Sequence, residues 1–347
     1  MNRKNRELYD FVGKYLMVYL PGLKVCSPNT LKSYRESLNM FLEYSAKKAD
    51  RPLEKLDLNI FQKQNIAGFL DYLTNDRPCK VGTRNLRLSC LKSFLKYVMR
   101  EQPIYMTYYE QASQITLQSD SKKLVPYITE EELRIVFSVV DEKSAIGQRN
   151  LVILIVMYDT GARVQEIVNL KLSDYSQRKD VATLRLLGKG GKIRLVPLMP
   201  NTVKQLDSYI KRFHPNETTY ETPLFYTRYN DAKKTMSIDA IERFVKDYGK
   251  LAREKCNSIP ANLHPHIFRH SRAMHLYQAG MPLTLISQWL GHANLETTLI
   301  YAFADTNMKR EAIAKATHDD NPIRTTEIAT IWNDDADTLK RLCGLKV

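Results

Sequence analysis

Residues 181–198 have the sequence VATLRLLGKGGKIRLVPL. Two short runs rich in leucine, valine and isoleucine flank a glycine-rich turn at residues 188–192, and this pattern predicts a β-hairpin. On both sides of it, apolar residues recur at the spacing of amphipathic helices. The sequence therefore predicts a mainly α-helical fold with one small β-hairpin sheet.

The hairpin is expected to lie inside a domain that spans residues 127–316. Thr129 precedes an apolar run and Glu132 follows three residues later, which is the spacing of a capping box. Helices are predicted over residues 130–140 and about 147–158. Helical patterns resume near Asn201 and again from about residue 237.

A separate helical domain is predicted over residues 1–112. Ser27 and Pro28 form a helix start, since a capping residue precedes a proline at the first helical position, and apolar residues follow to residue 45. The same spacing recurs over residues 66–73 and 88–98. From Gln102 to Lys123 the periodicity lapses, so residues 113–126 are predicted to be the linker.

The net charge suggests a polyanionic partner. The 347 residues contain 52 Lys and Arg against 38 Asp and Glu, a formal net charge of +14. Nucleic acid is the first partner that such an excess indicates, and an anionic membrane surface is the second. Residues 317–347 are net acidic and are expected to contact protein rather than phosphates.

Other classes of protein fit less well. The longest apolar run, Leu151–Tyr158, is far shorter than the roughly 20 residues that span a bilayer. The N-terminus is basic but lacks an apolar signal segment, so a cytoplasmic protein acting on DNA is expected. The five cysteines are scattered and never spaced as CxxC, which disfavours a disulfide framework or a thiolate zinc site.

Basic residues on the predicted N-terminal helices are candidates for phosphate contact, with a merely solvated basic face as the alternative. They are Lys32, Arg35, Lys80, Arg84, Arg87 and Lys92.

Five of the seven histidines fall within residues 264–292. His266 and His270 would share a helix face, but no HExxH motif and no nearby cysteine completes a metal site. His266 and Arg269 also lie one turn apart, which suits two donors on one phosphate, although such a pair is often structural. Likewise, the turn at residues 188–192 lacks the GxxxxGK[ST] pattern of a nucleotide-binding loop.

Four motifs occur in a fixed order: TGARxxEI at residues 160–167, LGKGGKxRLVPL at 187–198, HxxRH at 266–270 and LGHxxxxTTxxYA at 290–302. In this order they resemble the tyrosine recombinase family, which includes phage integrases and Xer-like proteins. The resemblance covers roughly residues 8–316. It implies a two-domain C-shaped clamp, with a SAM-like core-binding domain before the catalytic domain.

The resemblance also implies the catalytic residues, with Tyr301 as the nucleophile that forms a covalent 3′-phosphotyrosine. The other matching positions are Arg163, Lys189, His266, Arg269 and His292. Lys192, on the same turn as Lys189, is the alternative lysine. Glu166 and His270 are predicted to support the site, Glu166 by orienting Arg163 three residues before it, with a surface ion pair as the alternative.

These residue types suit phosphodiester cleavage. Arg163 and Arg269 would be fixed cationic donors to the transition state, and guanidinium groups keep their charge near neutral pH, so no metal cofactor is expected. A free phenol titrates near pH 10, so Tyr301 needs a proton acceptor, and the resemblance implies His266.

Lys189 would protonate the departing 5′-oxygen, and His292 would donate a hydrogen bond to the phosphate. The tyrosine ester conserves the energy of the broken bond, so no ATP is expected.

The predicted function is site-specific recombination for a mobile element, through integration, excision or transposition. The expected partners are double-stranded DNA with inverted-repeat core sites and three further copies of the chain in a tetramer, with residues 317–347 docked on a neighbouring copy or on their own domain. Xer-like dimer resolution, a type IB-like topoisomerase and a catalytically silent DNA-binding protein are the alternatives.

Overall fold

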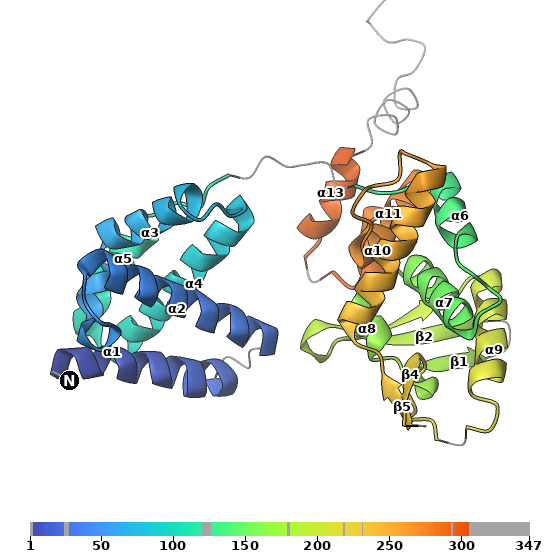
Figure 1. The fold of residues 1–347 in the computed structure, drawn as a ribbon, viewed down its shortest axis with the longest axis horizontal. Coiled ribbons are helices and arrows are strands. Elements are labelled where there is room, and N and C mark those ends of the chain that lie inside the picture. The colour runs from blue at the N-terminus through green and yellow to red at the C-terminus, as the bar shows by residue number, and fades with distance from the viewer. Residues whose placement is uncertain are drawn as a thin grey trace, which may run out of the picture. The chain divides into compact units, whose positions relative to one another are not determined.

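The computed structural model describes residues 3–23, 28–119, 126–178, 181–217, 219–230, 232–292 and 294–304. The chain divides into two compact units, Met1–Lys122 and Lys123–Val347 (Figure 1). Both are built mainly of helices, and two small antiparallel sheets lie in the second unit. The predicted fold class is therefore confirmed.

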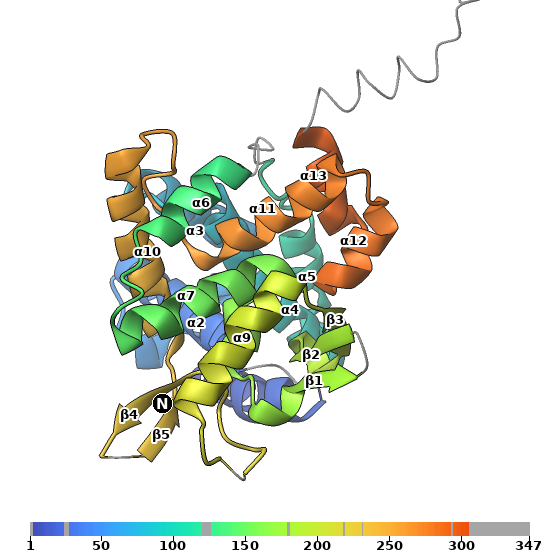
Figure 2. The same cartoon turned by 90° about the vertical axis from the view of Figure 1, so that its right-hand side faces the viewer.

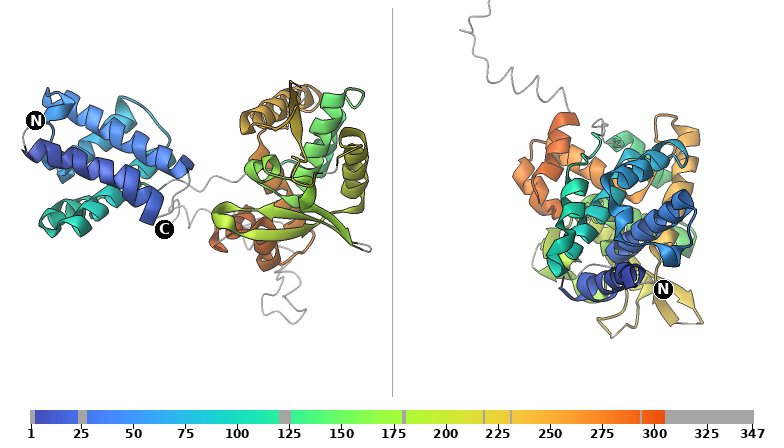
Figure 3. Two further views of the ribbon diagram at one scale, coloured as in Figure 1. Left: turned by 90° about the horizontal axis from the view of Figure 1, so that it is seen from below. Right: turned by 90° about the vertical axis from the view of Figure 1, so that its left-hand side faces the viewer.

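The N-terminal unit is entirely helical over its described residues (Figure 3). Its α-helices are α1 (Arg3–Lys14), α2 (Pro28–Ala49), α3 (Lys63–Asn75), α4 (Val81–Glu101) and α5 (Met106–Ser113), and a π-helical segment, Tyr15–Leu23, follows α1. Aromatic side chains fill its core, among them the fully buried Tyr15, Phe41, Phe69 and Phe94. Helix α2 extends the predicted helix to Ala49, while its predicted cap, Ser27, lies outside the described residues.

Helix α5 lies where the apolar periodicity of the sequence lapses. It packs against α4, and aromatic side chains rather than an aliphatic stripe join it to the core of the unit. Tyr108 also donates a hydrogen bond from its hydroxyl to Asn59 Oδ1 at 2.7 Å. These contacts place α5 within the N-terminal unit.

The C-terminal unit surrounds helix α7 (Ala145–Thr160), which lies between α9 and α11 (Figure 2). Its other helices are α6 (Glu130–Ser138), α8 (Val164–Val168), α9 (Pro200–Phe213), α10 (Ile238–Lys255), α11 (Pro265–Gln278), α12 (Leu283–Leu290) and α13 (Glu296–Ala304). The capping box before α6 is confirmed: Thr129 Oγ1 accepts the Glu132 N–H, and Glu132 Oε2 accepts the Thr129 N–H.

The predicted hairpin is present, but it is part of a larger sheet. Strands β2 (Val181–Leu187) and β3 (Ile193–Pro197) pair antiparallel, and β1 (Tyr175–Arg178) adds a third strand beside β2. A second hairpin, β4 (Tyr226–Tyr229) and β5 (Ala232–Thr235), was not predicted. Its turn begins at Asn230, whose φ of 47° is a left-handed conformation that asparagine tolerates.

Over the described residues, no helix combines the length and the apolarity that crossing a membrane requires. The described cysteines Cys79, Cys90 and Cys256 are free thiols.

Candidate active site

The turn after α7 presents Arg163. Helix α7 ends at Gly161, whose φ of 60° is left-handed, and Arg163 caps the next helix, α8. The buried carboxylate of Glu166 accepts hydrogen bonds from the Arg163 backbone N–H at 2.8 Å and from Nη1 at 3.0 Å. Burial alone would raise the pKa of Glu166, but hydrogen bonds and charges from Arg194 and Arg163 lower it below its usual value. Glu166 is therefore ionised and orients Arg163.

Arg269 lies on α11, and its side chain is almost completely buried. Nη1 donates to the carbonyl oxygen of Gly161 and Nη2 donates to that of Leu290, both at 2.6 Å. Burial, followed by the charge of Arg163, lowers the pKa of Arg269 to about 9, so the group is still protonated at pH 7. Arg269 thus brings a positive charge beside Arg163 and links α11 both to the turn after α7 and to the end of α12.

Tyr301 lies on α13 with its side chain 1% exposed. Its hydroxyl forms a hydrogen bond with Nδ1 of His270 at 2.9 Å. Burial raises the pKa of Tyr301 to about 12, although the charges of Arg269 and Arg163 act in the opposite direction. Deprotonation of this phenol therefore requires a base in contact with it.

His270, and not His266, is the imidazole in contact with Tyr301. His266 is exposed one turn earlier on α11, with its ring centroid 6.4 Å from that of His270. This contact was not predicted, and the sequence-based assignment of His266 as the proton acceptor stays a prediction. The HxxRH spacing places both rings on one face of α11, so the pattern could have suggested either residue.

Burial, then the charge of His266, lowers the pKa of His270 to about 4. Its ring is therefore neutral at pH 7 and can accept a proton at Nδ1 when Nε2 carries the hydrogen.

His292 lies in the connection between α12 and α13. Its Nδ1 is 2.7 Å from Thr298 Oγ1, which fixes the ring orientation. Burial, followed by the charges of Arg269 and Arg163, lowers the pKa of His292 to about 4. Helices α11, α12 and α13 lie side by side (Figure 2), which brings His270 on α11 into contact with Tyr301 on α13.

Lys189 lies in the turn between β2 and β3, and its side chain is outside what the structure describes. The turn is closed by a hydrogen bond from the Gly188 N–H to the Lys192 carbonyl oxygen at 2.8 Å. Lys192 is exposed.

Arg194 has no role in the sequence-based assignment, although it falls within the quoted motif. It lies on β3 with its side chain 12% exposed and forms a bidentate ion pair with Glu166. No spacing rule links residue 194 to residue 166, so only the folded chain reveals this contact.

The six basic candidates in the N-terminal unit separate into three groups. Lys32, Arg35 and Lys80 are exposed, as a phosphate-contacting face requires. Arg84 is half-buried, with Nε and Nη1 buried and without a hydrogen-bond partner in the structure.

Arg87 and Lys92 form hydrogen bonds inside the unit, and their contact with phosphate stays a prediction. Arg87 Nη1 donates to Ser37 Oγ at 2.9 Å and connects α4 with α2. Lys92 Nζ donates to the Ile115 carbonyl oxygen at 2.6 Å, just beyond the end of α5, where a cation complements the helix dipole.

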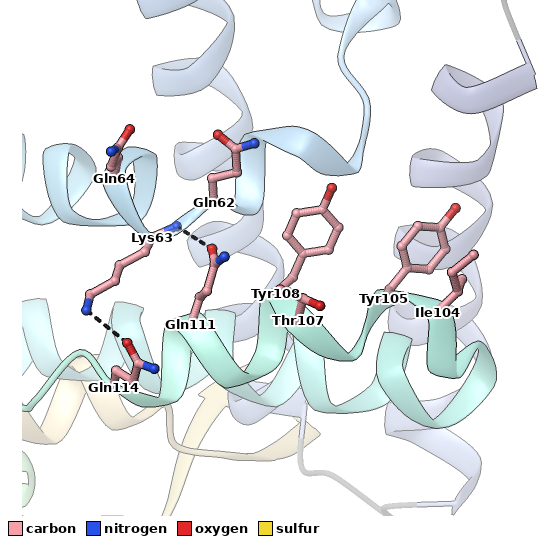
Figure 4. A pocket seen from close by; sticks show the side chains of 9 residues that line it. All are labelled: Gln62, Lys63, Gln64, Ile104, Tyr105, Thr107, Tyr108, Gln111 and Gln114. Carbon is pink, nitrogen blue, oxygen red and sulfur yellow. Dashed lines mark hydrogen bonds between the residues drawn. The ribbon is translucent and has the colours of Figure 1, made fainter.

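A cavity of about 690 Å³ lies beside α3 and α5 (Figure 4). Amide, hydroxyl and aromatic side chains and Ile104 line it, and among these described residues Lys63 alone is charged. Gln111 and Gln114 hold Lys63 through hydrogen bonds of 3.2 and 3.0 Å. No predicted site residue lines this cavity.

Comparison with known families gives two matches. Residues 126–308 match the phage integrase family, and residues 14–102 match the phage integrase N-terminal SAM-like domain. Residues 305–347, which include the predicted tail at 317–347, lie outside the described residues.

Curated relatives align over most of their length. The chain is 30% identical over 292 residues to tyrosine recombinase XerA of Pyrococcus horikoshii, covering 84% of this chain and 88% of that protein. It is 29% identical over 309 residues to tyrosine recombinase XerC of Chlamydia caviae, covering 84% and 94%. A Sinorhizobium fredii protein named as an integrase/recombinase, y4rC, is 28% identical over 313 residues, covering 90% and 92%.

Solved structures share the fold. XerH site-specific recombinase bound to its difH substrate superposes with a TM-score of 0.63 at 23% identity, covering 83% of this chain and 79% of that one. The Tn1549 transposon integrase in complex with transposon right-end DNA gives 0.65 at 16% identity, covering 90% and 99%. A lambda integrase tetramer bound to a Holliday junction gives 0.60 at 17% identity, covering 83% and 77%.

Proposed function

This chain belongs to the phage integrase family of tyrosine recombinases, and from that premise we propose that it cleaves and rejoins DNA through a covalent 3′-phosphotyrosine at Tyr301. The family carries out site-specific DNA recombination. The observation that carries the proposal is the 2.9 Å hydrogen bond between the Tyr301 hydroxyl and Nδ1 of His270. It gives a buried phenol a neutral base in direct contact.

In the proposed reaction, the Tyr301 oxygen attacks the scissile phosphorus as the bond to the 5′-oxygen breaks. The phenolic proton passes to His270 Nδ1, and Lys189 supplies the proton that the departing 5′-oxygen needs. Rejoining reverses these steps, with a 5′-hydroxyl attacking the tyrosine ester. The bonds formed and broken balance, so no ATP enters the reaction.

The developing charge on the non-bridging oxygens needs fixed cationic donors. Arg163 and Arg269 lie close enough to lower the pKa of Tyr301, which supports placing both beside the reacting phosphate. His266 is exposed and His292 is half-buried, and we assign both to hydrogen bonds with the phosphate. Because guanidinium groups stay charged near neutral pH, the reaction is proposed to need no metal cofactor.

The proposed DNA substrate carries inverted-repeat core sites bound by a tetramer of this chain. The lambda integrase tetramer on a Holliday junction and the DNA-bound XerH support this proposal, since both share the fold. The exposed Lys32, Arg35 and Lys80 are proposed to contact backbone phosphates. Residues 317–347 are proposed to dock on a neighbouring copy within the tetramer.

We assign the biological role to a mobile element that is integrated, excised or transposed, with support from the relative named as an integrase/recombinase. Xer-type dimer resolution is the second candidate, which the relatives named XerC and XerA favour. Sequencing the DNA target separates the two, because a site within an element's ends supports the first and a single chromosomal site supports the second.

Covalent trapping in cells tests the chemistry. Wild type, Tyr301→Phe and Tyr158→Phe are expressed, the cells are lysed under denaturing conditions, and DNA that remains attached to the protein is sequenced. Tyr158 is a matched control, because its hydroxyl lies 2.8 Å from His275 Nδ1 in a second tyrosine–histidine pair of the same unit. Adducts joined through a 3′-phosphate are expected from wild type and Tyr158→Phe.

Adducts from Tyr301→Phe would contradict the nucleophile assignment. If no protein gives an adduct, even with a nicked trapping substrate, the silent DNA-binding alternative replaces the proposal.

A further inference from the structure

All three nitrogen atoms of the Arg194 guanidinium donate hydrogen bonds within the protein. Nη1 and Nη2 donate to the two carboxylate oxygens of Glu166 at 2.8 and 2.7 Å, and Nε donates to the carbonyl oxygen of Trp289 at 3.0 Å. The fork of a guanidinium holds these three donors in one plane, whereas a lysine ammonium is a single point. Arg194 therefore fixes two acceptors relative to each other.

The first acceptor, the Glu166 carboxylate, also binds Arg163. The same Glu166 carboxylate receives the Arg163 backbone N–H and Nη1, so two arginines share one buried anion. Arg194 occupies the remaining acceptor positions and holds the carboxylate in one orientation. The direction of Arg163 thus depends on a group that Arg194 holds in place.

The second acceptor, the Trp289 carbonyl oxygen, lies just before the segment that carries His292 and Tyr301. Trp289 lies in the last turn of α12, and Gly291 ends that helix with a left-handed φ of 64°. A Cβ at Gly291 would lie 3.0 Å from Arg194 Nη1 and 3.1 Å from its Cδ, so the guanidinium packs directly on this backbone. The backbone that leaves α12 toward His292 therefore packs against the Arg194 side chain.

We propose that Arg194 is a positioning residue that aligns Arg163 with the His292–Tyr301 segment. This inference rests on the proposed function. Arg194 acts through Glu166 and the Trp289 carbonyl, and the DNA phosphate is contacted by the residues it aligns.

The substitution that tests this role is Arg194→Lys. It keeps the positive charge near Glu166, but a lysine ammonium cannot donate hydrogen bonds to the carboxylate and to the Trp289 carbonyl oxygen at the same time. From the usual strength of hydrogen bonds to charged groups, single-turnover cleavage is expected to fall about 10- to 100-fold. Binding of one half-site is expected to change less than about twofold, because the exposed phosphate-contacting residues are unaltered.

Arg149→Lys is the matched control. Arg149 is a half-buried arginine near the start of α7, and its fork donates to the Tyr226 carbonyl oxygen and to Asn150 Oδ1. Covalent adduct formation on a nicked substrate and the melting temperature are measured for both variants. Wild-type cleavage by Arg194→Lys, or a loss equal to that of Arg149→Lys, would overturn the proposal.

A modified substrate separates positioning from proton donation. When sulfur replaces the bridging 5′-oxygen, the leaving thiolate needs no proton, so a defect in the proposed acid Lys189 is relieved. Lys189→Ala is expected to recover on this substrate, and Arg194→Lys is expected to remain slow. Recovery of Arg194→Lys to the wild-type rate would reject alignment of Arg163 and Tyr301 as its role.

Hydrogen exchange gives a measurement that needs no reaction. In DNA-free protein, the peptides that carry His292 and Tyr301 are expected to exchange faster in Arg194→Lys than in wild type or Arg149→Lys. If this difference is present while wild type forms no adduct, the proposed function fails and the positioning role stands. Equal exchange in all three proteins overturns the positioning role.

Discussion

Arg269 Nη1 donates a hydrogen bond to the carbonyl oxygen of Gly161 over 2.6 Å, which joins the middle of α11 to the turn just before Arg163. A second bond, from Nη2 to the Leu290 carbonyl oxygen, joins the same side chain to the end of α12. One buried guanidinium therefore holds together the segments that carry Arg163 and His292. This side chain, which we propose binds the phosphate, therefore also stabilises the unit in the absence of DNA.

Arg269→Lys is expected to destabilise the protein as well as to impair cleavage. The ammonium group cannot reach both carbonyl oxygens, and leaving one of them buried and unpaired costs about 2–3 kcal/mol in the free energy of unfolding. Urea denaturation monitored by circular dichroism measures this loss. A change below about 1 kcal/mol would show that the two carbonyl contacts contribute little.

Gly161→Ala is expected to destabilise the turn before Arg163. The residue has a φ of 60°, which L-residues with a Cβ adopt at a cost of about 1–2 kcal/mol, and the added Cβ would lie 2.7 Å from Leu290 Cδ2. A loss of at least about 2 kcal/mol is expected on thermal or urea denaturation. Gly82→Ala is the control, since a Cβ there has no neighbour within 4 Å and alanine favours the helix.

The protein is expected to lose stability as the pH falls from about 6.5 toward 4. Burial lowers the pKa of His270 and of His292 to about 4 in the folded state, below the ordinary histidine value. Between pH 4 and 6.5 the unfolded chain binds protons at these two histidines more readily than the folded protein does, so protonation favours unfolding. The stabilisation that comes from holding both histidines neutral is complete only above the ordinary histidine pKa.

Urea denaturation of wild type and His270→Gln at several pH values checks this dependence. The variant should show the shallower fall, and an identical pH dependence would indicate that His270 titrates normally in the fold.

Lys92 and Lys80 are expected to differ in their effects, although both are basic residues of the N-terminal unit. Lys80→Met removes an exposed charge and should reduce the slope of log affinity against log salt by about 1 if Lys80 contacts a phosphate. Lys92→Met should leave that slope unchanged and lower stability by about 1–2 kcal/mol, because it removes the cation at the end of α5.

Filter binding of half-site DNA at four salt concentrations, together with urea denaturation, separates the two effects. An unchanged slope for Lys80→Met would remove Lys80 from the proposed DNA interface.

Local patterns predicted much of the secondary structure and missed some of it. The capping box at Thr129 and the β2–β3 hairpin follow from residues within a few positions of each other, and both are present in the structure. Strand β1 and the β4–β5 hairpin were missed, because their four-residue strands carry too little alternation to distinguish them from loops. Helix α5 was missed because aromatic packing on α4 replaced an aliphatic stripe.

The sequence by itself determined the family, the fold class and the candidate catalytic positions, because these depend on the identity and order of residues along the chain. Only the tertiary structure decided which imidazole meets Tyr301, since His270 and Tyr301 are 31 residues apart and join through the packing of α11 on α13. It likewise decided that Arg194 reaches Trp289, 95 residues away. Helical spacing specifies a face, but the element packed against that face is selected by the burial of side chains from the whole unit.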